Sequence, residues 1–194
     1  MFIIGQILFP VLLIFLVFIE GVIVAALILV FVSGLISHFY GAPYVPVKKK
    51  AIKDILLFGG LSLNDNFYDL GSGDGRVLIS AVRDFGVQKA AGYEISLWPY
   101  LKARLLLRRA GLKDRIKIFR RNFFKADLSA ATFVYLYLFP KLVDRLAYKL
   151  ARECRSGAKI LCLSFPIDIT RHSQFRLLKS EKIGKMMAYL HEKI

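Results

Sequence analysis

The pattern of hydrophobic and polar positions divides the chain into two unlike parts. Residues 2–36 are almost uninterrupted apolar sequence, whereas from residue 66 onward short apolar runs alternate with amphipathic stretches. About 20 apolar residues are enough for a helix to cross a bilayer, so the first part is long enough for one span and too short for two comfortable spans with a loop. Alternating strands and helices in the second part are typical of an α/β domain with a mostly parallel sheet.

The alternating part predicts seven strands, which we place at residues 67–70, 90–94, 116–119, 133–138, 159–164, 175–178 and 185–191. Helices are predicted at residues 76–85, 99–110 and 141–154, and a lead-in helix at residues 48–58. The last two strands have no helix between them, so they predict a hairpin that makes one edge of the sheet antiparallel. We therefore divide the chain into a membrane anchor at residues 1–40, a connector with the lead-in helix at 41–60, and an α/β domain at 61–194.

The apolar segment has two interpretations, a single long helix and a hairpin. A single helix at about residues 12–38 is favoured, while Glu20-Gly21 would form the bend of a hairpin. A cleaved signal peptide needs a basic start and a short apolar core, and this segment has neither. Because a carboxylate is costly in the middle of a bilayer, Glu20 is expected near the outer surface, or else in contact with another membrane protein.

Composition adds a strong positive charge, with 29 Lys and Arg against 14 Asp and Glu and a formal net charge of +15. Such a charge fits anionic lipid, nucleic acid or an acidic partner. The adjacent apolar segment favours lipid. Lys48, Lys49, Lys50 and Lys53 follow that segment and no basic side chain precedes it, so the positive-inside rule predicts a single-pass protein with its domain in the cytoplasm.

Candidate chemistry begins where the first predicted strand ends. Asp69 is followed by Gly71, Gly73 and Gly75, a spacing that differs from the G-x-G-x-x-G of dinucleotide sites. Glycines at a strand end, followed by a helix, predict a nucleotide-type cofactor site. Glu94 ends the second predicted strand and could accept hydrogen bonds from a ribose, although capping of the next helix or a surface ion pair is the alternative.

The third predicted strand is followed by Asn122, Phe123 and Phe124, which could bind an adenine edge and pack against its ring. The alternative is a helix cap with core aromatics. Cys154 and Cys162 have no metal-binding spacing, so no metal site is predicted and two free thiols in a reducing compartment are expected.

Together these motifs resemble a class I, seven-stranded S-adenosylmethionine-dependent methyltransferase, with a Rossmann-like sheet after an N-terminal transmembrane helix. A narrower resemblance is to the small membrane-anchored protein-lysine methyltransferases, whose mitochondrial members modify the ATP synthase c-subunit and the adenine nucleotide translocase. It is carried by segments that occur in this order: Pro43-Tyr44-Val45-Pro46, Asp69 to Arg76, Gly92-Tyr93-Glu94-Ile95, Leu136-Tyr137-Leu138-Phe139-Pro140 and Ser164-Phe165-Pro166.

The resemblance implies that S-adenosyl-L-methionine is the cofactor and assigns its binding residues. These would be Asp69, Gly71, Ser72, Gly73 and Gly75 beside the methionine and ribose, Glu94 at the ribose diol, and Asn122 and Phe123 at the adenine. Tyr44 and Val45 would form part of a lid over the pocket. Residues 138–140 lack the Asn/Asp-Pro-Pro-aromatic motif of base-methylating enzymes, which weakens a base-methylation function.

A lysine acceptor must be neutral to attack a methyl group, and an apolar channel lowers its pKa by desolvation. The candidates for that channel are aromatic residues and a proline beside them. Tyr137 and Phe139 are the candidate catalytic residues, and Tyr44, Pro140 and Phe165 would line the substrate channel. Each of the aromatic residues could equally belong to the core. The expected substrate is a lysine-bearing membrane protein. The protein is expected to contact the lipid bilayer through residues 1–40 and the juxtamembrane lysines.

Two other functions stay open. One is methylation of a small molecule or lipid at the membrane. The other is a non-catalytic module that binds nucleic acid, suggested by a strip of basic side chains: Lys102, Arg104, Arg108, Arg109, Lys113, Arg115, Lys117, Arg120 and Arg121.

Overall fold

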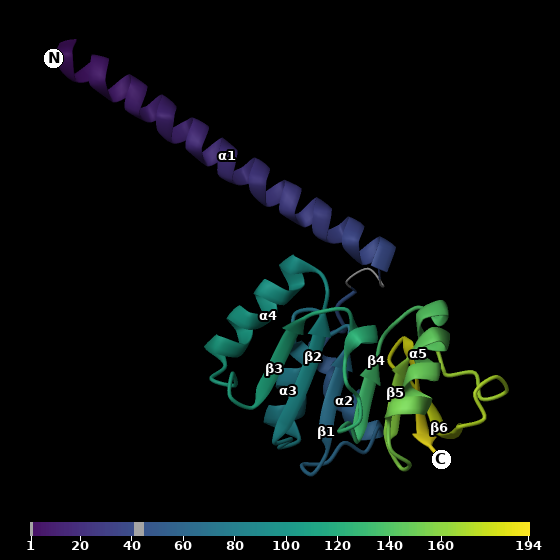
Figure 1. The fold of residues 1–194 in the computed structure, drawn as a ribbon. Coiled ribbons are helices and arrows are strands. Elements are labelled where there is room, and N and C mark those ends of the chain that lie inside the picture. The colour runs from purple at the N-terminus through teal and green to yellow at the C-terminus, as the bar shows by residue number, and fades with distance from the viewer. Residues whose placement is uncertain (1, 41–44) are drawn as a thin grey trace.

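The computed structural model describes residues 2–40 and 45–194, with side chains described for residues 10–32 and 45–194. A long helix, α1 (Phe2–Tyr40), precedes a body of seven strands and four α-helices, which occur in this order: α2 (Lys49–Phe58), β1 (Asn66–Leu70), α3 (Arg76–Asp84), β2 (Lys89–Glu94), α4 (Leu97–Arg109), β3 (Ile116–Arg120), the short 3-10 helix η1 (Phe123–Lys125), β4 (Phe133–Leu136), α5 (Pro140–Glu153), β5 (Lys159–Leu163), β6 (Phe175–Ile183) and β7 (Met186–Lys193). Figure 1 shows α1 projecting from this body.

The seven strands form one mixed sheet in the order β3-β2-β1-β4-β5-β7-β6. Strands β1 to β5 run parallel, and β7 lies antiparallel between β5 and β6. The predicted fold class is therefore confirmed, including the antiparallel hairpin. Strand β6 is longer than predicted, because residues 179–182 are polar and exposed on an edge strand, where the usual apolar alternation is not required.

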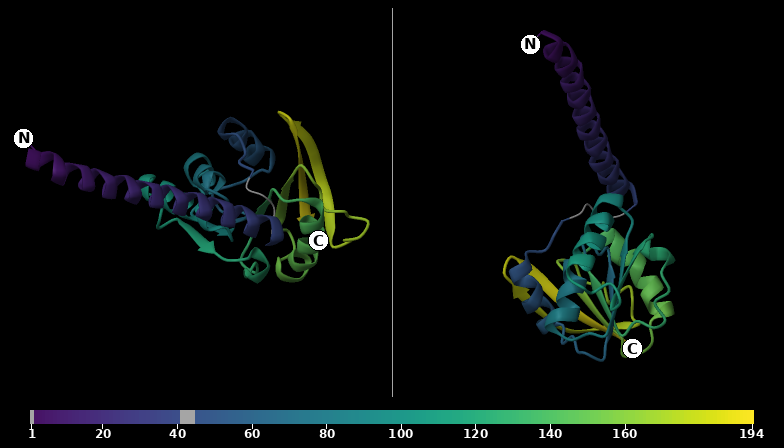
Figure 2. Two further views of the ribbon diagram at one scale, coloured as in Figure 1. Left: turned by 90° about the horizontal axis from the view of Figure 1, so that it is seen from above. Right: turned by 90° about the vertical axis from the view of Figure 1, so that its left-hand side faces the viewer.

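The core has two layers, one on each face of the sheet. Successive residues of β1 point to opposite faces: Phe67 packs in the cluster that contains α2 and α3, whereas Leu70 packs in the cluster that contains α5. Figure 2 shows these helices on either side of the sheet. This alternation places Asp69 on the same face as Phe67, toward α2 and α3.

Helix α2 packs closely against the sheet. Ile55 and Leu56 are fully buried, and Gly59 ends the helix so near the sheet that a Cβ there would lie 2.7 Å from Cζ of Phe133. Val47, just before the helix, is buried as well. The chain from Val47 to Gly59 therefore packs against the body.

Helix α1 is continuous through Glu20-Gly21, so the chain forms a single helix there rather than a hairpin. It is longer than predicted, beginning at Phe2 and ending at Tyr40. Its segment Pro10–Val32 is the one helix among the described residues that is long and apolar enough to cross a membrane, and none of that segment is buried in the body. Both figures show α1 running outward on the side where α4 lies, and the two helices are in contact.

Candidate active site

The glycine loop after β1 is held against the end of β2. The N–H groups of Gly71 and Ser72 both donate to the carbonyl of Tyr93, at 2.9 and 3.0 Å. Gly71 and Gly73 have φ angles of 99° and 53°, in the left-handed region that costs little only for glycine. The loop can therefore turn sharply into α3 at the carboxyl edge of the sheet, where open α/β sheets bind their ligands.

Glu94 is buried at the end of β2 and contacts this loop directly. Its Oε2 accepts a hydrogen bond from the N–H of Gly73 at 2.9 Å, and its Oε1 accepts one from the N–H of Ser96 at 2.7 Å. Burial raises the pKa of Glu94, while the hydrogen bonds from Ser96 and Gly73 oppose that rise. The carboxylate thus joins the glycine loop to the start of α4 and keeps further lone pairs for a ligand.

Close packing fixes the space behind the loop. A Cβ on Gly92 would lie 2.5 Å from Cδ1 of Leu78 and 2.8 Å from Oγ of Ser72. Glycine at this position therefore allows β2 to approach both the loop and α3. Any larger side chain would displace the atoms that border the site.

Two further carboxylates lie at the site with Glu94. Asp74 is paired with Arg76, whose Nε and Nη2 donate at 2.8 and 2.7 Å, and with Lys102 at 3.1 Å. Asp69 forms no ion pair with any described residue, and burial together with the charges of Glu94 and Asp74 raises its pKa well above the ordinary value. A cation bound beside Asp69 would relieve this unfavourable burial.

These residues border a cavity of about 700 Å³, counted with the open space at its mouth. Two buried hydroxyls that border it, Oγ of Ser72 and the OH of Tyr135, have no hydrogen-bond partner among the described residues. Tyr135 lies beside Asp69 in the register of β4 and β1. Orphaned buried hydroxyls are costly, so they indicate that a polar ligand completes the site.

The chain just before α2 covers one side of the cavity. Val45, Pro46 and Val47 line it, and Nη1 of Arg76 donates to the carbonyl of Val47 at 2.9 Å. The predicted lid residue Val45 is therefore at the cavity. Tyr44, predicted with it, lies outside the described residues.

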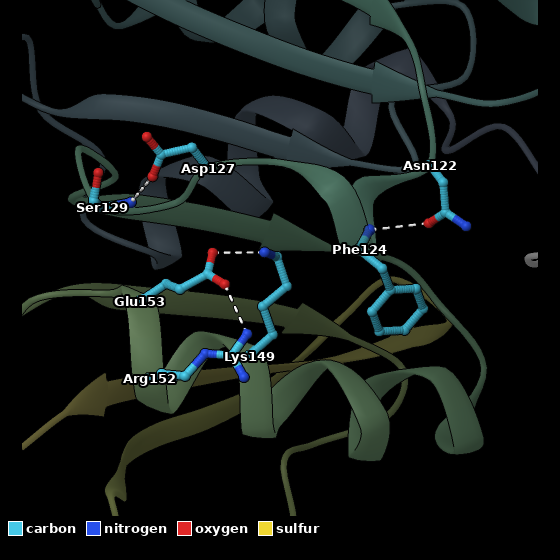
Figure 3. Close-up of polar contacts among 7 residues, drawn as sticks. All are labelled: Asn122, Phe124, Asp127, Ser129, Lys149, Arg152 and Glu153. Carbon is cyan, nitrogen blue, oxygen red and sulfur yellow. Dashed lines mark hydrogen bonds and ion pairs between the residues drawn. The ribbon is translucent and has the colours of Figure 1, made fainter.

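The structure brings seven of the predicted site residues together around the cavity: Asp69, Gly71, Ser72, Gly73, Glu94, Phe123 and Tyr137. Gly75 is instead the N-cap of α3, where a Cβ would lie 3.4 Å from Cβ of Ala103 in α4. Asn122 caps η1, with its Oδ1 accepting from the N–H of Phe124 at 2.9 Å (Figure 3). It is not among the cavity-lining residues.

The other predicted residues lie outside the cavity lining. Phe139 and Pro140 are exposed at the start of α5, and Phe165 is partly buried after β5. The lining includes residues that were not singled out as site residues, namely Asp74, Arg76, Tyr93, Ile95, Tyr135 and Leu138. The sequence does carry a signal for Tyr135. It lies two residues before the predicted Tyr137, and residues two apart in an extended chain share a face.

Comparison with known proteins assigns this domain. The family model of the ANTKMT methyltransferase domain matches residues 69–174, which is more than half of the chain and runs from β1 to the residue before β6. The chain belongs to the ANTKMT methyltransferase domain family. It is an S-adenosylmethionine-dependent methyltransferase.

Individual relatives agree with this family. A protein-lysine N-methyltransferase from Saccharolobus islandicus (strain REY15A) is 36% identical over 131 residues, covering 68% of this chain and 81% of that protein. The adenine nucleotide translocase lysine N-methyltransferase of Mus musculus is 32% identical over 126 residues, covering 64% of this chain. The match covers 54% of the mouse protein, so the ANTKMT-family chain spans about half of that relative's length.

A solved structure gives the same assignment for the fold and the cofactor. The crystal structure of an RNA methyltransferase from Salinibacter ruber in complex with S-adenosyl-L-homocysteine superposes with a TM-score of 0.70 at 29% identity. The match covers 77% of this chain and 94% of that one. The cofactor of this ANTKMT-family enzyme is S-adenosylmethionine.

The residues at the cavity fit that cofactor. S-adenosylmethionine carries positive charge on its sulfur and its amino group, and the buried carboxyl of Asp69 lacks a basic partner among the described residues. Ser72 and Tyr135 offer hydroxyls without partners. Glu94 lies at the end of β2, where a carboxylate binds the ribose hydroxyls in related nucleotide folds.

Proposed function

We propose that this protein is a membrane-anchored protein-lysine N-methyltransferase that modifies a lysine of a membrane-associated protein. The names of two relatives, a protein-lysine N-methyltransferase and an adenine nucleotide translocase lysine N-methyltransferase, support lysine as the acceptor. Within the structure, the short connection between α1 and the cavity supports a membrane-associated acceptor.

That connection limits how far the cavity can lie from a bilayer. Helix α1 ends at Tyr40, and Val45 already lines the cavity. Five extended residues span at most about 17 Å, and the eight helical residues beyond Val32 add about 12 Å. If the segment Pro10–Val32 spans the bilayer, the cavity is therefore within roughly 30 Å of its surface.

We divide the roles along the chain accordingly. Residues 1–40 form the anchor, residues 41–60 the connector with α2, and residues 61–194 the methyltransferase domain. The lysines that follow α1 place the domain on the cytoplasmic side in this proposal. An anchor confines enzyme and substrate to one surface and so raises their effective concentration.

The chemistry asks little of the protein beyond alignment and desolvation. When bound, S-adenosylmethionine supplies a methyl group that is already activated by its positive sulfur. Asp69 and Glu94 orient the cofactor, and Tyr135 donates or accepts a hydrogen bond at the cavity wall. Tyr137 follows β4 directly, is partly buried, packs against the same cluster as Tyr135 and can accept a hydrogen bond from the substrate amine.

Apolar residues then favour the neutral form of the amine. Val45, Pro46, Val47 and Leu138 are apolar residues that border the cavity. A lysine placed among them loses hydration, which lowers its pKa and leaves its lone pair free to attack. We assign Phe139, Pro140 and Phe165 to the outer approach, since they lie near the carboxyl ends of β4 and β5 but outside the cavity lining.

The decisive experiment is methyl labelling of native membranes by the wild-type chain and by Glu94→Ala, with mass spectrometry of the labelled site. We expect label on a lysine of a membrane protein with the wild-type chain and none with the variant. Label on lipid would support methylation of a lipid or small molecule instead. Label on RNA would support the activity named for the Salinibacter ruber protein, and either result would overturn lysine methylation as the function.

A further inference from the structure

Helix α4 carries a row of large apolar side chains that are partly exposed. Trp98, Leu101 and Leu105 are 48%, 41% and 48% exposed. Their spacing of three and four residues places them on one face of the helix. The opposite face packs inward through Ala103 and Leu107, which are buried. An exposed apolar row of this kind on a helix is typical of an interaction site.

Basic side chains flank this row on both sides. By helical position, Arg104 and Arg108 lie along one side and Lys102 and Arg109 along the other. Between residues 97 and 121 the chain has nine Lys and Arg and a single acid, Asp114. A helix with an apolar face, basic flanks and an exposed tryptophan matches the helices that lie in a membrane interface.

The neighbouring edge strand β3 extends the same surface. A groove between α4 and β3 is lined by apolar and basic side chains and by no acid, among them Leu101, Leu105, Phe119, Arg104, Arg108 and Lys117. We call these six residues, together with Trp98, the α4–β3 surface. Its charge is complementary to the phosphates of lipid head groups.

The position of α1 indicates what covers this surface. Helix α1 contacts α4 and runs outward on the same side of the body (Figures 1 and 2). The segment Pro10–Val32 lies eight residues, or about 12 Å, before the end of the helix at Tyr40. A bilayer around that segment would bring its head groups close to the level of α4.

We propose that the α4–β3 surface docks on the anionic face of the bilayer, as a second membrane contact beside α1. Trp98, Leu101 and Leu105 would enter the boundary between head groups and acyl chains, while Arg104 and Arg108 bind lipid phosphates. This inference depends on the proposed anchoring by α1. RNA would use the basic side chains but would have no use for a leucine pair at the centre of the contact.

Docking would also orient the active site. Helix α4 begins at Leu97, three residues after Glu94, and Lys102 of the same helix is paired with Asp74 at the cavity. A docked α4 would therefore hold the cavity at a fixed height and angle to the membrane. The substrates selected in this way are lysines that lie close to the head groups.

Trp98 is the one tryptophan in the chain, so its fluorescence reports on this surface alone. The experiment uses the full chain reconstituted into vesicles of phosphatidylcholine, with and without phosphatidylglycerol. With the anionic lipid we expect Trp98 emission to move to shorter wavelength, to be quenched by lipids brominated in the acyl chain, and to be protected from aqueous acrylamide. Emission that is the same in both vesicles, with no quenching by brominated lipid, would overturn the docking proposal.

Charge variants sharpen the result. Each basic side chain near an anionic surface favours binding by a factor of roughly five, so Arg104→Gln with Arg108→Gln should lower the ratio of docked to undocked protein by roughly 25-fold. The matched control is Lys182→Gln with Lys185→Gln, which removes two exposed charges from the hairpin at the other edge of the sheet and should change nothing. Equal losses in both variants would also overturn a specific α4–β3 contact.

Two readouts separate this proposal from the proposed function. Flotation with the vesicles tests the anchor, and Trp98 emission tests docking. Protein that floats without any response of Trp98 overturns docking and leaves the anchor intact, whereas protein that floats with neither vesicle overturns both proposals. A shift of Trp98 emission on adding a short RNA to the detergent-solubilised chain, with no response to anionic vesicles, would assign the surface to nucleic acid.

Discussion

The cofactor cavity and the α4–β3 surface adjoin the same helix but have opposite charge. At the cavity, Asp69, Asp74 and Glu94 are at most 8% exposed. At the surface, the basic side chains reach into solvent. Charges taken out of water interact strongly with a bound ligand, whereas exposed charges are screened by salt over about 8 to 10 Å. The net charge of +15 therefore describes the outer surface and says nothing of the ligand in the cavity.

The largest expected effect in the cavity comes from Glu94→Gln. The amide keeps the size of the side chain but loses the charge that accepts hydrogen bonds from Gly73 and Ser96. We expect the dissociation constant for S-adenosylmethionine to rise about 100-fold, since hydrogen bonds to a charged group contribute about 1.5–3 kcal/mol each. Calorimetric titration measures it, with the exposed Glu181→Gln as the control. Unchanged affinity in Glu94→Gln would show that this carboxylate does not bind the cofactor.

The next effect is a pH dependence that belongs to Asp69. Burial, followed by the charges of Glu94 and Asp74, raises its pKa from the ordinary 3.8. A cationic cofactor favours the ionised carboxylate, so affinity should increase by up to about tenfold per pH unit from pH 4 until the raised pKa is passed. Asp69→Asn should flatten much of that slope, and the remainder belongs to Glu94, whose pKa is raised as well.

In the cofactor-free protein, a rise in pH should lower the contribution of Asp69 to folding stability, whereas the same rise increases the affinity for the cofactor. A carboxyl with a pKa raised in the folded state stabilises the fold fully below its unfolded pKa, and this stabilisation is lost as the pH rises through the folded pKa. Denaturant unfolding between pH 4 and 7 measures the effect. Wild-type protein should lose stability relative to Asp69→Asn as the pH rises. A difference that stays constant with pH would contradict the buried, unpaired state of Asp69.

A smaller effect is expected for Tyr135→Phe. Its hydroxyl is buried without a partner among the described residues, so its removal should leave the stability of the cofactor-free protein unchanged or slightly higher. Cofactor affinity should fall about fivefold, the value of one neutral hydrogen bond of about 1 kcal/mol. Thermal unfolding with and without cofactor gives both numbers. A loss of stability without cofactor would mean that the hydroxyl already has a partner in the free protein.

The double variant Arg104→Gln with Arg108→Gln should have the smallest effect on cofactor binding. Both side chains lie outside the cavity lining, so affinity for S-adenosylmethionine should stay within about twofold, at low and at high salt. Membrane docking by the same variant should fall and should depend on salt. A large change in cofactor affinity would break the distinction between the two regions.

Much of this architecture could be predicted from local sequence patterns. The seven strands, the glycine loop after β1 and Glu94 at the end of β2 follow from apolar runs, glycines and alternation. Each of these signals is contained within a few neighbouring residues. A single helix was also favoured for the apolar segment, at about residues 12–38 and with a hairpin bend at Glu20-Gly21 left open, and α1 is continuous through both residues.

Local patterns could not predict the role of a side chain where that role depends on elements distant in the sequence. Tyr135 acquires a place at the cavity because β4 pairs with β1 in a register that sets it beside Asp69. The geometry shows Asn122 as the cap of η1, a possibility that the sequence left open beside adenine binding. Strand β7 lies between β5 and β6 although it follows both in the chain.

The leucines of α4 show most clearly where local information ends. The sequence predicted a helix at residues 99–110, close to the observed α4, but it did not determine which of its leucines face the sheet. The tertiary structure decided it: Leu107 is buried against the core, while Leu101 and Leu105 are exposed beside the basic side chains. Whether a side chain is buried depends on what packs against it. For α4 this is a sheet whose strands come from distant parts of the chain.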